Sequence, residues 1–426
     1  MGTGVPRRLD VVIVGGSLAG LCVGVALKTL PEVGSITVLE RQPSSQLQDQ
    51  GAGIRVGDEV AEFLQRYANA SMSSYGIPLN SFKILDQGGK VVINKDVVSN
   101  CATTWSQLFR VLMLAFTEKS CDDVAATKYR YSCNAWNVIE RDDRVEVQFV
   151  NGVGKEETLL ADLVIGADGA SSKVRDIMFP DAKRTYAGYV LFRGLVPVED
   201  LSVATMQVMD LSGTMCFNRN AQMFSYIVPA NKVGNPDSHN HFNWGWYIRK
   251  TEEELAELMT DVNGVRHLFT LPPKGMCRHL ADEMRAKAQD ELPPQFAEAV
   301  VKTRDPFVQV ITDSLAPENL FWGGRVILLG DAAAGQRPHT AAAVTQACLH
   351  AQFLKLHLQG QLSRDDWSRE VQLVSSTLVS AGQDLGAICL SETINPSEKA
   401  KLYLAKFLAV QTLLNERWRL FSSEGK

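Results

Sequence analysis

The sequence predicts an α/β protein in which a parallel, helix-covered sheet is interleaved with a second, mainly antiparallel β-sheet domain and is followed by C-terminal helices. Three observations predict this class. The first forty residues show a strand, a glycine turn, a helix and another strand, which is how a parallel sheet begins. Two later buried strands, at 163–165 and 325–329, each lead into a Gly and Asp sequence. Between them lie alternating, aromatic-rich segments that are typical of antiparallel strands.

Composition and charge further limit the kinds of protein that this sequence can encode. The chain has 426 residues, 45% hydrophobic and 21% charged, with 43 Lys+Arg against 48 Asp+Glu. This length suggests two or three domains, and the lack of a Lys/Arg-rich run excludes a nucleic-acid footprint. The eight cysteines are scattered without CxxC spacing, so we expect reduced thiols and no metal site. The apolar run 11–27 is short and broken by glycines, so we expect no transmembrane segment and a cytoplasmic protein.

The elements predicted for the first half alternate between strands and helices. Strands are expected at 11–14 and 36–39, with a helix at 18–30 that Pro31 closes. A helix at 57–67, a hairpin of 82–85 with 91–94, and an amphipathic helix at 106–118 follow. Residues 130–140, 145–150 and 158–160 are predicted to form an antiparallel meander.

The second half is predicted to begin with the antiparallel sheet and to end in helices. Strands are expected at 189–197, 207–209, 222–229 and 241–248, and helices at 251–260, 280–290, 294–303 and from Pro338 onward. We therefore expect a discontinuous first domain of residues 8–80, 100–182 and 305–360. A substrate-binding sheet domain is expected at 81–99 and 183–304, and a helical region at 361–426.

A glycine-rich turn links the first strand to the first helix. It consists of Gly15, Gly16, Ser17, Leu18, Ala19 and Gly20. Glycines permit a tight turn here, and the unpaired N–H groups at the helix start attract a pyrophosphate. Glu40 follows Gly20 by twenty residues at the end of the second strand, where a carboxylate accepts hydrogen bonds from ribose hydroxyls. The combination predicts a Rossmann-like dinucleotide-binding domain. Ser17 is the departure, because the fingerprint has glycine where the backbone approaches the phosphates.

Two further strand ends carry candidate chemistry. Asp168 and Gly169 follow the strand at 163–165, where the alternative is an Asp-Gly turn before a Ser-capped helix. Asp331 follows the strand at 325–329 and stands at the carboxyl edge of the sheet, where open α/β sheets bind ligands. Because a carboxylate would repel a pyrophosphate, we expect Asp331 to bind a hydroxyl of a polyol chain. Pro338 is expected to begin the next helix, with its positive end facing an anionic group.

These three motifs, in this order and spacing, resemble the class A flavoprotein monooxygenases, the aromatic hydroxylases with the para-hydroxybenzoate hydroxylase type of fold. The resemblance covers most of residues 8–360 and is strongest to the 2,6-dihydroxypyridine hydroxylase-like branch, through the segments 186–194, 243–247 and 337–342. It implies FAD, NADPH or NADH as co-substrate, and O2. It also implies hydroxylation of a small phenolic or hydroxypyridine-type ring through a flavin C4a-hydroperoxide, with oxidative decarboxylation as a variant.

The resemblance also implies which residues hold FAD. The glycine turn would lie at the pyrophosphate, Glu40 and Arg41 at the adenosine ribose, and Gly330 and Asp331 at the ribityl chain. Asp168 and Gly169 match a motif used for FAD and the nicotinamide donor. The remaining matches are Arg110 on a helix near the cofactor, Gly53 and Ile54 in a segment (51–54) along the flavin, and Pro338, Ala341 and Ala342. Two departures concern the flavin edge, where Ala334 replaces a histidine and Ala343 a glycine.

Four residues are candidates for the substrate side of the site. His339 is expected to deprotonate or hold a phenolic substrate, the alternative being a helix-capping or solvent-facing histidine. Arg193 is expected to bind a substrate carboxylate unless it only supports an Arg-Gly bend. Strand alternation places Asn243 and Tyr247 on one face and two tryptophans, 244 and 246, on the other, where ordinary sheet packing is favoured for the tryptophans.

Other functions share parts of this pattern. A flavin-dependent halogenase is one alternative, because residues 244–248 resemble the start of its WxWxIP signature, although Arg249 stands where the proline should be. A tailoring monooxygenase that epoxidises or rearranges an alkaloid or polyketide would use the same motifs, and a non-enzymatic flavoprotein is a further alternative. The amphipathic stretch 399–421 is expected to pack on its own domain, with a homodimer or membrane-surface contact as the alternatives.

Overall fold

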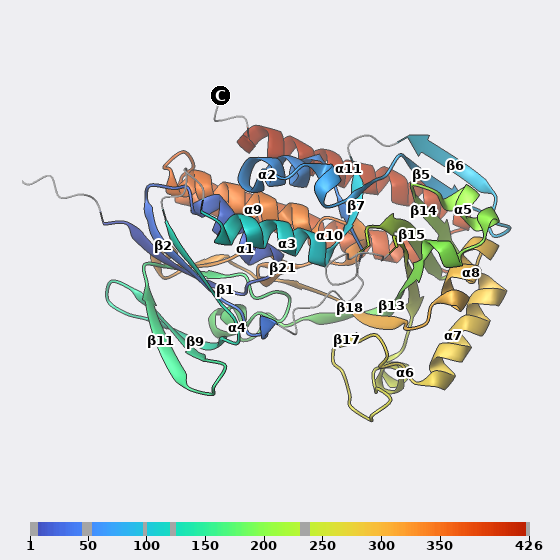
Figure 1. Ribbon diagram of the computed structural model, residues 1–426, viewed down its shortest axis with the longest axis horizontal. Helices are drawn as coiled ribbons and strands as arrows, with labels where there is room; N and C mark the ends of the chain where they lie inside the picture. Colours follow the sequence, from blue (N-terminus) through green and yellow to red (C-terminus); the bar gives the residue numbers. More distant parts are fainter. Residues whose placement is uncertain (1–6, 45–52, 97–99, 120–124, 231–238, 423–426) are drawn as a thin grey trace, which may run out of the picture.

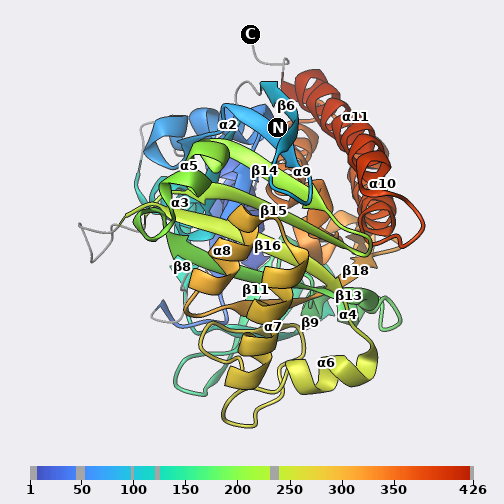
Figure 2. The ribbon, with the colours of Figure 1, turned by 90° about the vertical axis from the view of Figure 1, so that its right-hand side faces the viewer.

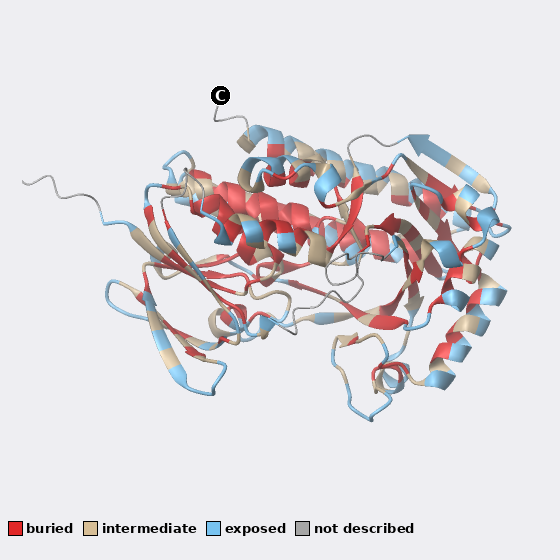
Figure 3. Cartoon of the chain, viewed as in Figure 1, coloured by how far each residue is buried: buried red, intermediate tan, exposed pale blue. Residues whose placement is uncertain are grey.

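The computed structural model describes residues 7–44, 53–96, 100–119, 125–230 and 239–422. Two sheets lie at opposite ends of the molecule, and the long helices α9 (Ala343–Leu358), α10 (Arg364–Cys389) and α11 (Pro396–Ser422) run between and above them (Figure 1). The fold class is the predicted one. Figure 3 shows α9 as a largely buried helix at the centre, where it packs against α10 and α11.

A six-stranded sheet forms one end of the molecule. Its order is β19 (Leu320–Phe321), β20 (Val326–Leu328), β12 (Leu163–Gly166), β1 (Leu9–Val14), β2 (Val33–Leu39) and β8 (Ala126–Arg130). All neighbouring pairs are parallel except β19 with β20. The carboxyl ends of β1, β2, β12 and β20 therefore share one edge, so the glycine turn, Glu40, Asp168 and Asp331 follow strands that end side by side.

Helix α1 (Leu18–Leu27) packs inside the protein between this sheet and two other helices. Nine of its ten residues are buried, which explains why its sequence is apolar all round and not amphipathic. It lies against α9 and against α3 (Trp105–Thr117), where Gly24 comes next to the ring of Phe116. The helix ends at Leu27, three residues before the expected end at residue 30.

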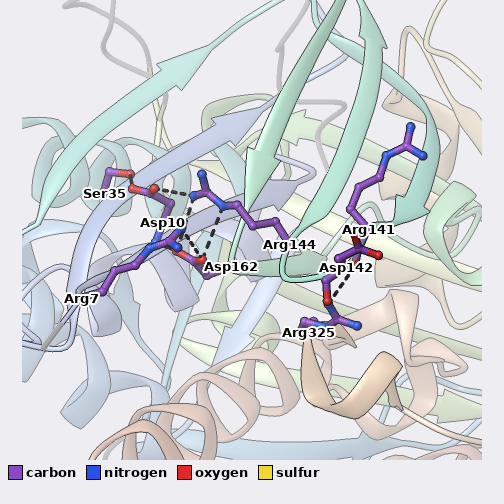
Figure 4. Close-up of polar contacts among 8 residues, drawn as sticks. All are labelled: Arg7, Asp10, Ser35, Arg141, Asp142, Arg144, Asp162 and Arg325. Carbon is purple, nitrogen blue, oxygen red and sulfur yellow. Dashed lines mark hydrogen bonds and ion pairs between the residues drawn. The ribbon is translucent and has the colours of Figure 1, made fainter.

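A three-stranded sheet of β9 (Asn134–Glu140), β10 (Val145–Val150) and β11 (Glu156–Ala161) forms the predicted meander. Its expected first residue was wrong, because Arg130 belongs to β8 of the six-stranded sheet. Polar contacts attach this small sheet to its neighbour (Figure 4). Arg144 reaches Asp10 at 2.5 Å, Ser35 donates to the same carboxylate at 2.6 Å, and Arg325 donates to two carbonyl groups in the turn before β10.

The second sheet has nine strands and is mainly antiparallel. Its order is β17 (Thr270–Leu271), β18 (Phe307–Leu315), β13 (Thr185–Pro197), β16 (His241–Arg249), β15 (Ala221–Val228), β14 (Ser212–Phe217), β5 (Ser81–Leu85) and β6 (Val91–Asp96), with β21 (Ala334–Gly335) beside β18. Only β14 and β5 pair in parallel among these strands of the described chain. The sheet includes β18, although the expected boundary at residue 305 placed that strand with the first domain. The division into domains stays a prediction.

The two faces of this sheet have different covers. One face packs on α7 (Arg278–Glu291) and α8 (Pro294–Lys302), and Trp244 and Trp246 lie in that core with Phe296. The other face, which carries Tyr189, Leu191 and Tyr247, packs on α10 and α11. Figure 2 shows the two pairs of helices on different sides of the sheet.

Short elements complete the chain. A small sheet consists of β3 (Gly53–Val56), β7 (Cys101–Thr104) and β4 (Ile77–Pro78). Helix α2 (Asp58–Ala68) and the 3₁₀ helix η2 (Met72–Ser74) lie between β3 and β4 in the sequence. The others are α4 (Lys173–Met178), η3 (Val198–Asp200), α5 (Val203–Met209), α6 (Glu252–Leu258), η4 (Trp322–Gly324), η5 (Gly330–Ala332) and η6 (Pro338–Thr340). Nothing in the described ranges is a helix of the length and apolarity that a membrane crossing requires.

Two expectations about these elements were wrong. Residues 207–209 end helix α5 and are not a strand, because Ser202 accepts a hydrogen bond from the N–H of Thr205 and caps that helix. Pro338 begins only the one-turn 3₁₀ helix η6, not the long helix. The chain then passes through Ala341 in the left-handed region (φ 50°), and α9 begins at Ala343.

Candidate active site

A cavity of about 390 Å³ lies at the carboxyl edge of the six-stranded sheet. Most of the predicted cofactor residues line it together: Gly15, Ser17, Leu18, Ala19, Glu40, Arg41, Asp168, Gly169, Gly330 and Asp331. They come from the ends of β1, β2, β12 and β20 and from the start of α1. The cavity also reaches Ala343, Val344 and Ala347 at the start of α9. Segments far apart in the sequence therefore build one site.

The glycine turn has the shape that close packing against β12 requires. Gly15 has φ +101°, and a Cβ atom on it would lie 2.4 Å from the Ala167 carbonyl oxygen. A Cβ atom on Gly20 would lie 2.0 Å from the Gly15 carbonyl oxygen. The N–H groups of the first turn of α1 have no partner within the helix, and this turn lines the cavity. The turn thus offers an anion the arrangement that binds phosphates at helix starts.

Glu40 is fixed at the end of β2. Its side chain is 6% exposed, and its two carboxylate oxygens accept hydrogen bonds from the N–H groups of Gly16 (2.9 Å) and Gln42 (2.8 Å). Each oxygen keeps a lone pair, so the carboxylate can still accept hydrogen bonds from two ribose hydroxyls. Gly16 does not line the cavity but orients Glu40 and receives a hydrogen bond from Tyr129 on its carbonyl oxygen.

Asp331 is a partly buried carboxylate near two arginines. Burial raises the pKa of Asp331 to about 6, and the positive charges of Arg184 and Arg175 oppose this rise. Arg175 is 1% exposed and donates to the carbonyl oxygens of Ala170 (2.7 Å) and Ala332 (3.2 Å), so it joins the loops that follow β12 and β20. Gly330 has φ +56° and donates its N–H to His350 Nδ1 at 3.1 Å. These contacts fix the backbone on either side of Asp331, which lines the cavity.

Asp168 has a second structural role. Its carboxylate accepts hydrogen bonds from the Ser172 hydroxyl (2.5 Å) and from the N–H groups of Lys173 (2.6 Å) and Val174 (3.2 Å), and it thereby caps α4. The pKa of Asp168 is raised by burial, against the effect of these hydrogen bonds. Gly169 has φ +80° and nothing within 4 Å of the position of a Cβ atom. The Asp-Gly turn thus ends β12, starts α4 and leaves open space at the cavity.

Besides Gly16 and Gly53, six predicted cofactor residues do not line this cavity. Arg110 is exposed and donates to the Ser74 carbonyl (3.2 Å) and to Gln107 (3.0 Å), beside a separate polar depression of about 490 Å³. The others are Gly20, which lies behind Gly15, and Ile54, Pro338, Ala341 and Ala342. Of the expected segment 51–54, residues 51 and 52 lie outside the described residues.

Trp105 lines the cavity and was not predicted. It is the first residue of α3, and its indole N–H donates to the Ser17 hydroxyl at 3.0 Å. Its separation of 88 residues from Ser17 leaves no local sequence signal for this contact.

Arg193 and Asn243 both hold the backbone of Gly53. Arg193 donates to the Gly53 carbonyl (3.2 Å) and to Gln309 (3.1 Å), and Asn243 accepts the Gly53 N–H at 3.1 Å. The Asn243 side chain is fully buried, and its Nδ2 atom makes no hydrogen bond in the described structure. The two side chains therefore attach β3 to the centre of the nine-stranded sheet.

His339 is a buried histidine with both ring nitrogens occupied. Nδ1 lies 3.1 Å from Gln222 Oε1 and Nε2 lies 3.1 Å from the Tyr189 hydroxyl. Because an amide oxygen only accepts, Nδ1 carries the proton and Nε2 accepts from Tyr189. The ring stacks on Tyr247 with 4.0 Å between centroids. Burial and Arg337 lower the pKa of His339 to about 3, so the ring is neutral at physiological pH.

The residues at the cavity fit FAD. The start of α1 supplies N–H groups for a pyrophosphate, Glu40 supplies acceptors for a ribose, and Asp331 supplies an acceptor for a polyol. The open space above Gly169 and the absence of side chains at Gly15 and Gly330 leave the backbone accessible. In the described ranges, no group of three or more His, Cys, Asp or Glu is placed to hold a metal ion.

Comparisons with known proteins point to flavin-dependent enzymes. The family model described as FAD binding domain-like matches residues 186–313. The 2,6-dihydroxypyridine 3-monooxygenase of Paenarthrobacter nicotinovorans is 27% identical over 82% of each chain. The 6-hydroxynicotinate 3-monooxygenase of Pseudomonas fluorescens is 25% identical over 79% of each chain.

A solved structure shares the fold over almost the whole chain. The 2,6-dihydroxypyridine-3-hydroxylase of Arthrobacter nicotinovorans superimposes with a TM-score of 0.79 at 24% identity, covering 92% of this chain and 97% of that one. The motifs expected from the sequence, the cavity that they line and these likenesses lead to one conclusion. In sequence and fold the chain is similar to FAD-dependent monooxygenases, the flavoproteins with the aromatic-hydroxylase fold.

Proposed function

We propose that the protein uses NADH or NADPH and O2 to hydroxylate a small phenolic or hydroxypyridine-type ring, with decarboxylation when the ring carries a suitable carboxylate. Two relatives support the ring class, because one is named for a dihydroxypyridine and the other for a hydroxynicotinate, which is also a hydroxypyridine. Both span about four fifths of this chain. FAD, when bound, supplies the electron acceptor for the nicotinamide and the group on which O2 is activated.

The observation that carries the proposal is the short connection between the FAD cavity and the nine-stranded sheet. His339 stacks on Tyr247 of β16, and Ala343, four residues later, lines the FAD cavity. The face of the sheet that carries Tyr247 is therefore next to one end of the cavity. A ring substrate bound on this face would lie close to the cofactor, which the reaction requires.

The side chains on this face suit a planar ring. Tyr226, Phe224 and Tyr247 come from adjacent strands on the same face, and the register opposes Phe224 to Gly245 and Tyr226 to Asn243. Phe224 lies 5.9 Å from Tyr247 and 6.0 Å from Tyr226 between ring centroids. Aromatic walls exclude water, which favours oxygen transfer to the ring over loss to solvent. The Nδ2 donor of Asn243 is the group that we assign to a ring substituent.

His339 and Arg193 act in this proposal as positioning residues. A histidine with a pKa of about 3 and two occupied nitrogens is a weak base, so its part is to hold Tyr189 and Tyr247 in place. Arg193 brings a buried positive charge to the same face and fixes Gly53. A substrate carboxylate or enolate would be attracted to that charge.

The experiment is oxidation of NADH and of NADPH in air by the FAD-loaded protein against a panel of hydroxybenzoates, plain phenols and hydroxypyridines, with the product mass measured in every reaction. The proposal expects one group of rings to accelerate oxidation and to gain one oxygen, and a product that has also lost CO2 would identify the decarboxylating variant. If FAD is bound and no ring accelerates oxidation, the proposal is wrong. A larger alkaloid or polyketide would then be tested as the substrate.

A further inference from the structure

A hydroxyl and an indole meet at the point where a dinucleotide-binding turn normally has its second glycine. Ser17 has extended backbone (φ −82°) and is the residue before α1, but its side chain does not cap that helix. Instead, Ser17 Oγ accepts a hydrogen bond from Trp105 Nε1 at 3.0 Å. Both residues line the FAD cavity next to Gly15, Leu18 and Ala19.

The hydrogen-bonding capacity of these groups decides where the serine proton points. An indole nitrogen only donates, whereas a serine hydroxyl has one proton and two lone pairs. Because Trp105 uses one lone pair of Ser17, the hydroxyl proton remains available for an acceptor in the cavity. The first turn of α1 contains no Lys or Arg, so an anion at this helix start would meet backbone N–H groups and this hydroxyl.

The indole is held in place independently of the cofactor. Trp105 is the first residue of α3, and Thr104 caps the helix by accepting the N–H of Gln107 at 3.3 Å. The indole also stacks on Phe109, with 4.6 Å between centroids and 18° between planes. Its N–H therefore points to Ser17 before any ligand binds, which reduces the entropy that binding would otherwise cost.

We propose that Ser17 and Trp105 form a pyrophosphate-positioning pair. The indole N–H fixes the serine oxygen, and the serine O–H donates to a pyrophosphate oxygen of FAD. In the usual fingerprint a glycine lets the backbone approach the phosphates directly. Here a side-chain hydrogen bond from Ser17 would take the place of that contact. This inference rests on the FAD site and not on the identity of the ring substrate.

Equilibrium binding to the flavin-free protein tests the pair without any activity measurement. The titrations compare FAD with riboflavin, which lacks the phosphates, for the wild type, Ser17→Ala, Trp105→Phe and the double variant. Because hydrogen bonds to charged groups are strong, we expect Ser17→Ala to weaken FAD binding about ten- to hundredfold. Trp105→Phe keeps an aromatic ring on Phe109 and is expected to weaken FAD binding about three- to tenfold. Riboflavin affinity should stay within about twofold for both variants.

The double variant and two controls make the result decisive. If the residues act as one unit, the double variant binds FAD no more than about twofold more weakly than Ser17→Ala, whereas independent residues would give additive losses. Ser17→Thr keeps the hydroxyl and should retain most of the affinity. Trp136→Phe, at a tryptophan that is 41% exposed and does not line the cavity, should bind like the wild type.

Three results would overturn the pair: unchanged FAD affinity in Ser17→Ala, equal losses for FAD and riboflavin, or additive losses in the double variant. A wild-type protein that fails to bind FAD at all would instead contradict the FAD site itself. The two failures are therefore distinguishable in one set of titrations.

Discussion

Asp331 is the predicted cofactor residue whose carboxylate is most clearly available to bind FAD. It follows β20, lines the cavity and has no competing cap to form, in contrast to Asp168, which caps α4. Asp331→Asn keeps the shape of the side chain but replaces a charged acceptor by a neutral amide. We expect FAD to bind about tenfold more weakly, because a hydrogen bond to a charged group is lost. The flavin-to-protein ratio of the purified variant measures this, and a ratio equal to that of the wild type would contradict the assignment.

The pKa of Asp331 predicts how the stability of the flavin-free protein depends on pH. The pKa of Asp331 is raised from 3.8 to about 6, so between these values the folded protein keeps a proton that the unfolded chain has released. The contribution of Asp331 to stability therefore falls as pH rises through this window. We expect flavin-free Asp331→Asn to melt at a higher temperature than the wild type at pH 7 and at a similar temperature near pH 4. Equal melting temperatures at both pH values would show that this charge is not buried in solution.

Gly15 shows why a residue can serve both fold and site. The substitution Gly15→Val would place a Cβ atom 2.4 Å from the Ala167 carbonyl and force a branched residue into positive φ. If the Gly15→Val variant loses flavin, the cause would therefore be a displaced end of β1 or β12 and not a lost contact with FAD. Asp331→Asn, which leaves the backbone unchanged, separates cofactor binding from folding.

At the scale of one element, the two faces of β16 pack against different helices, and we propose that the face with Tyr247 also contacts the ring substrate. Tyr247 faces His339 and the region next to the cavity, whereas Trp244 donates its indole N–H to Thr303 at 2.8 Å within the α7–α8 core. We expect Tyr247→Phe to raise KM for the ring about three- to tenfold with little change in melting temperature. Trp244→Phe should lower the free energy of unfolding by about 1–2 kcal/mol with KM unchanged. KM and melting curves of the two variants check this, and similar behaviour of both variants would refute the two-face account.

Sequence patterns identified most elements, and their failures have local causes. The segment 203–209 is rich in Val, Thr and Met, which favours a strand, yet it forms α5. The Ser202 hydroxyl caps the helix and also donates to Glu298 at 2.8 Å, so a tertiary contact decides the conformation. The strand β14 was not predicted, and it pairs in parallel with β5, more than a hundred residues earlier. Such long-range pairing leaves little trace in a local pattern.

At the scale of the whole molecule, Lys399 joins the C-terminal helices to the nine-stranded sheet. Its buried ammonium donates to the carbonyl oxygens of Asn218 (2.7 Å), Arg219 (2.5 Å) and Cys389 (3.0 Å), so it links α11, the β14–β15 turn and the end of α10. Lys399→Met would leave three buried carbonyl groups unsatisfied, and we expect a loss of about 2–3 kcal/mol in the free energy of unfolding. Hydrogen exchange should show faster opening of α11 in the variant.

Charge burial at Lys399 gives this link a pH dependence. Burial lowers the pKa of Lys399 to about 8 from 10.5, so between these values the unfolded chain binds more protons than the folded one. Its contribution to stability therefore rises with pH across this window. Lys399→Met should abolish that rise, and an unchanged pH dependence would assign it to other groups.

The candidate site could be predicted from the sequence where the cofactor-binding residues lie within one short segment. The glycine turn, Glu40 and Asp331 follow parallel strands, and strand topology alone brings them to one cavity. Trp105 and the surroundings of His339 were not predictable, because their partners Ser17, Gln222 and Tyr189 lie 88 to 150 residues away. His339 was expected to deprotonate or hold a phenolic substrate, with a helix cap or a solvent-facing position as the alternative. The structure encloses it between side chains from β13, β15 and β16.

We propose that the FAD-loaded protein inserts one atom of O2 into a small aromatic ring. The most direct measurement is a reaction under ¹⁸O2 with NADH or NADPH and the most active ring of the panel, followed by mass analysis of the product. We expect each product molecule to carry one ¹⁸O atom and one nicotinamide to be oxidised for each product molecule formed. Product oxygen derived from water, or nicotinamide oxidation that yields only hydrogen peroxide with every ring, would contradict it.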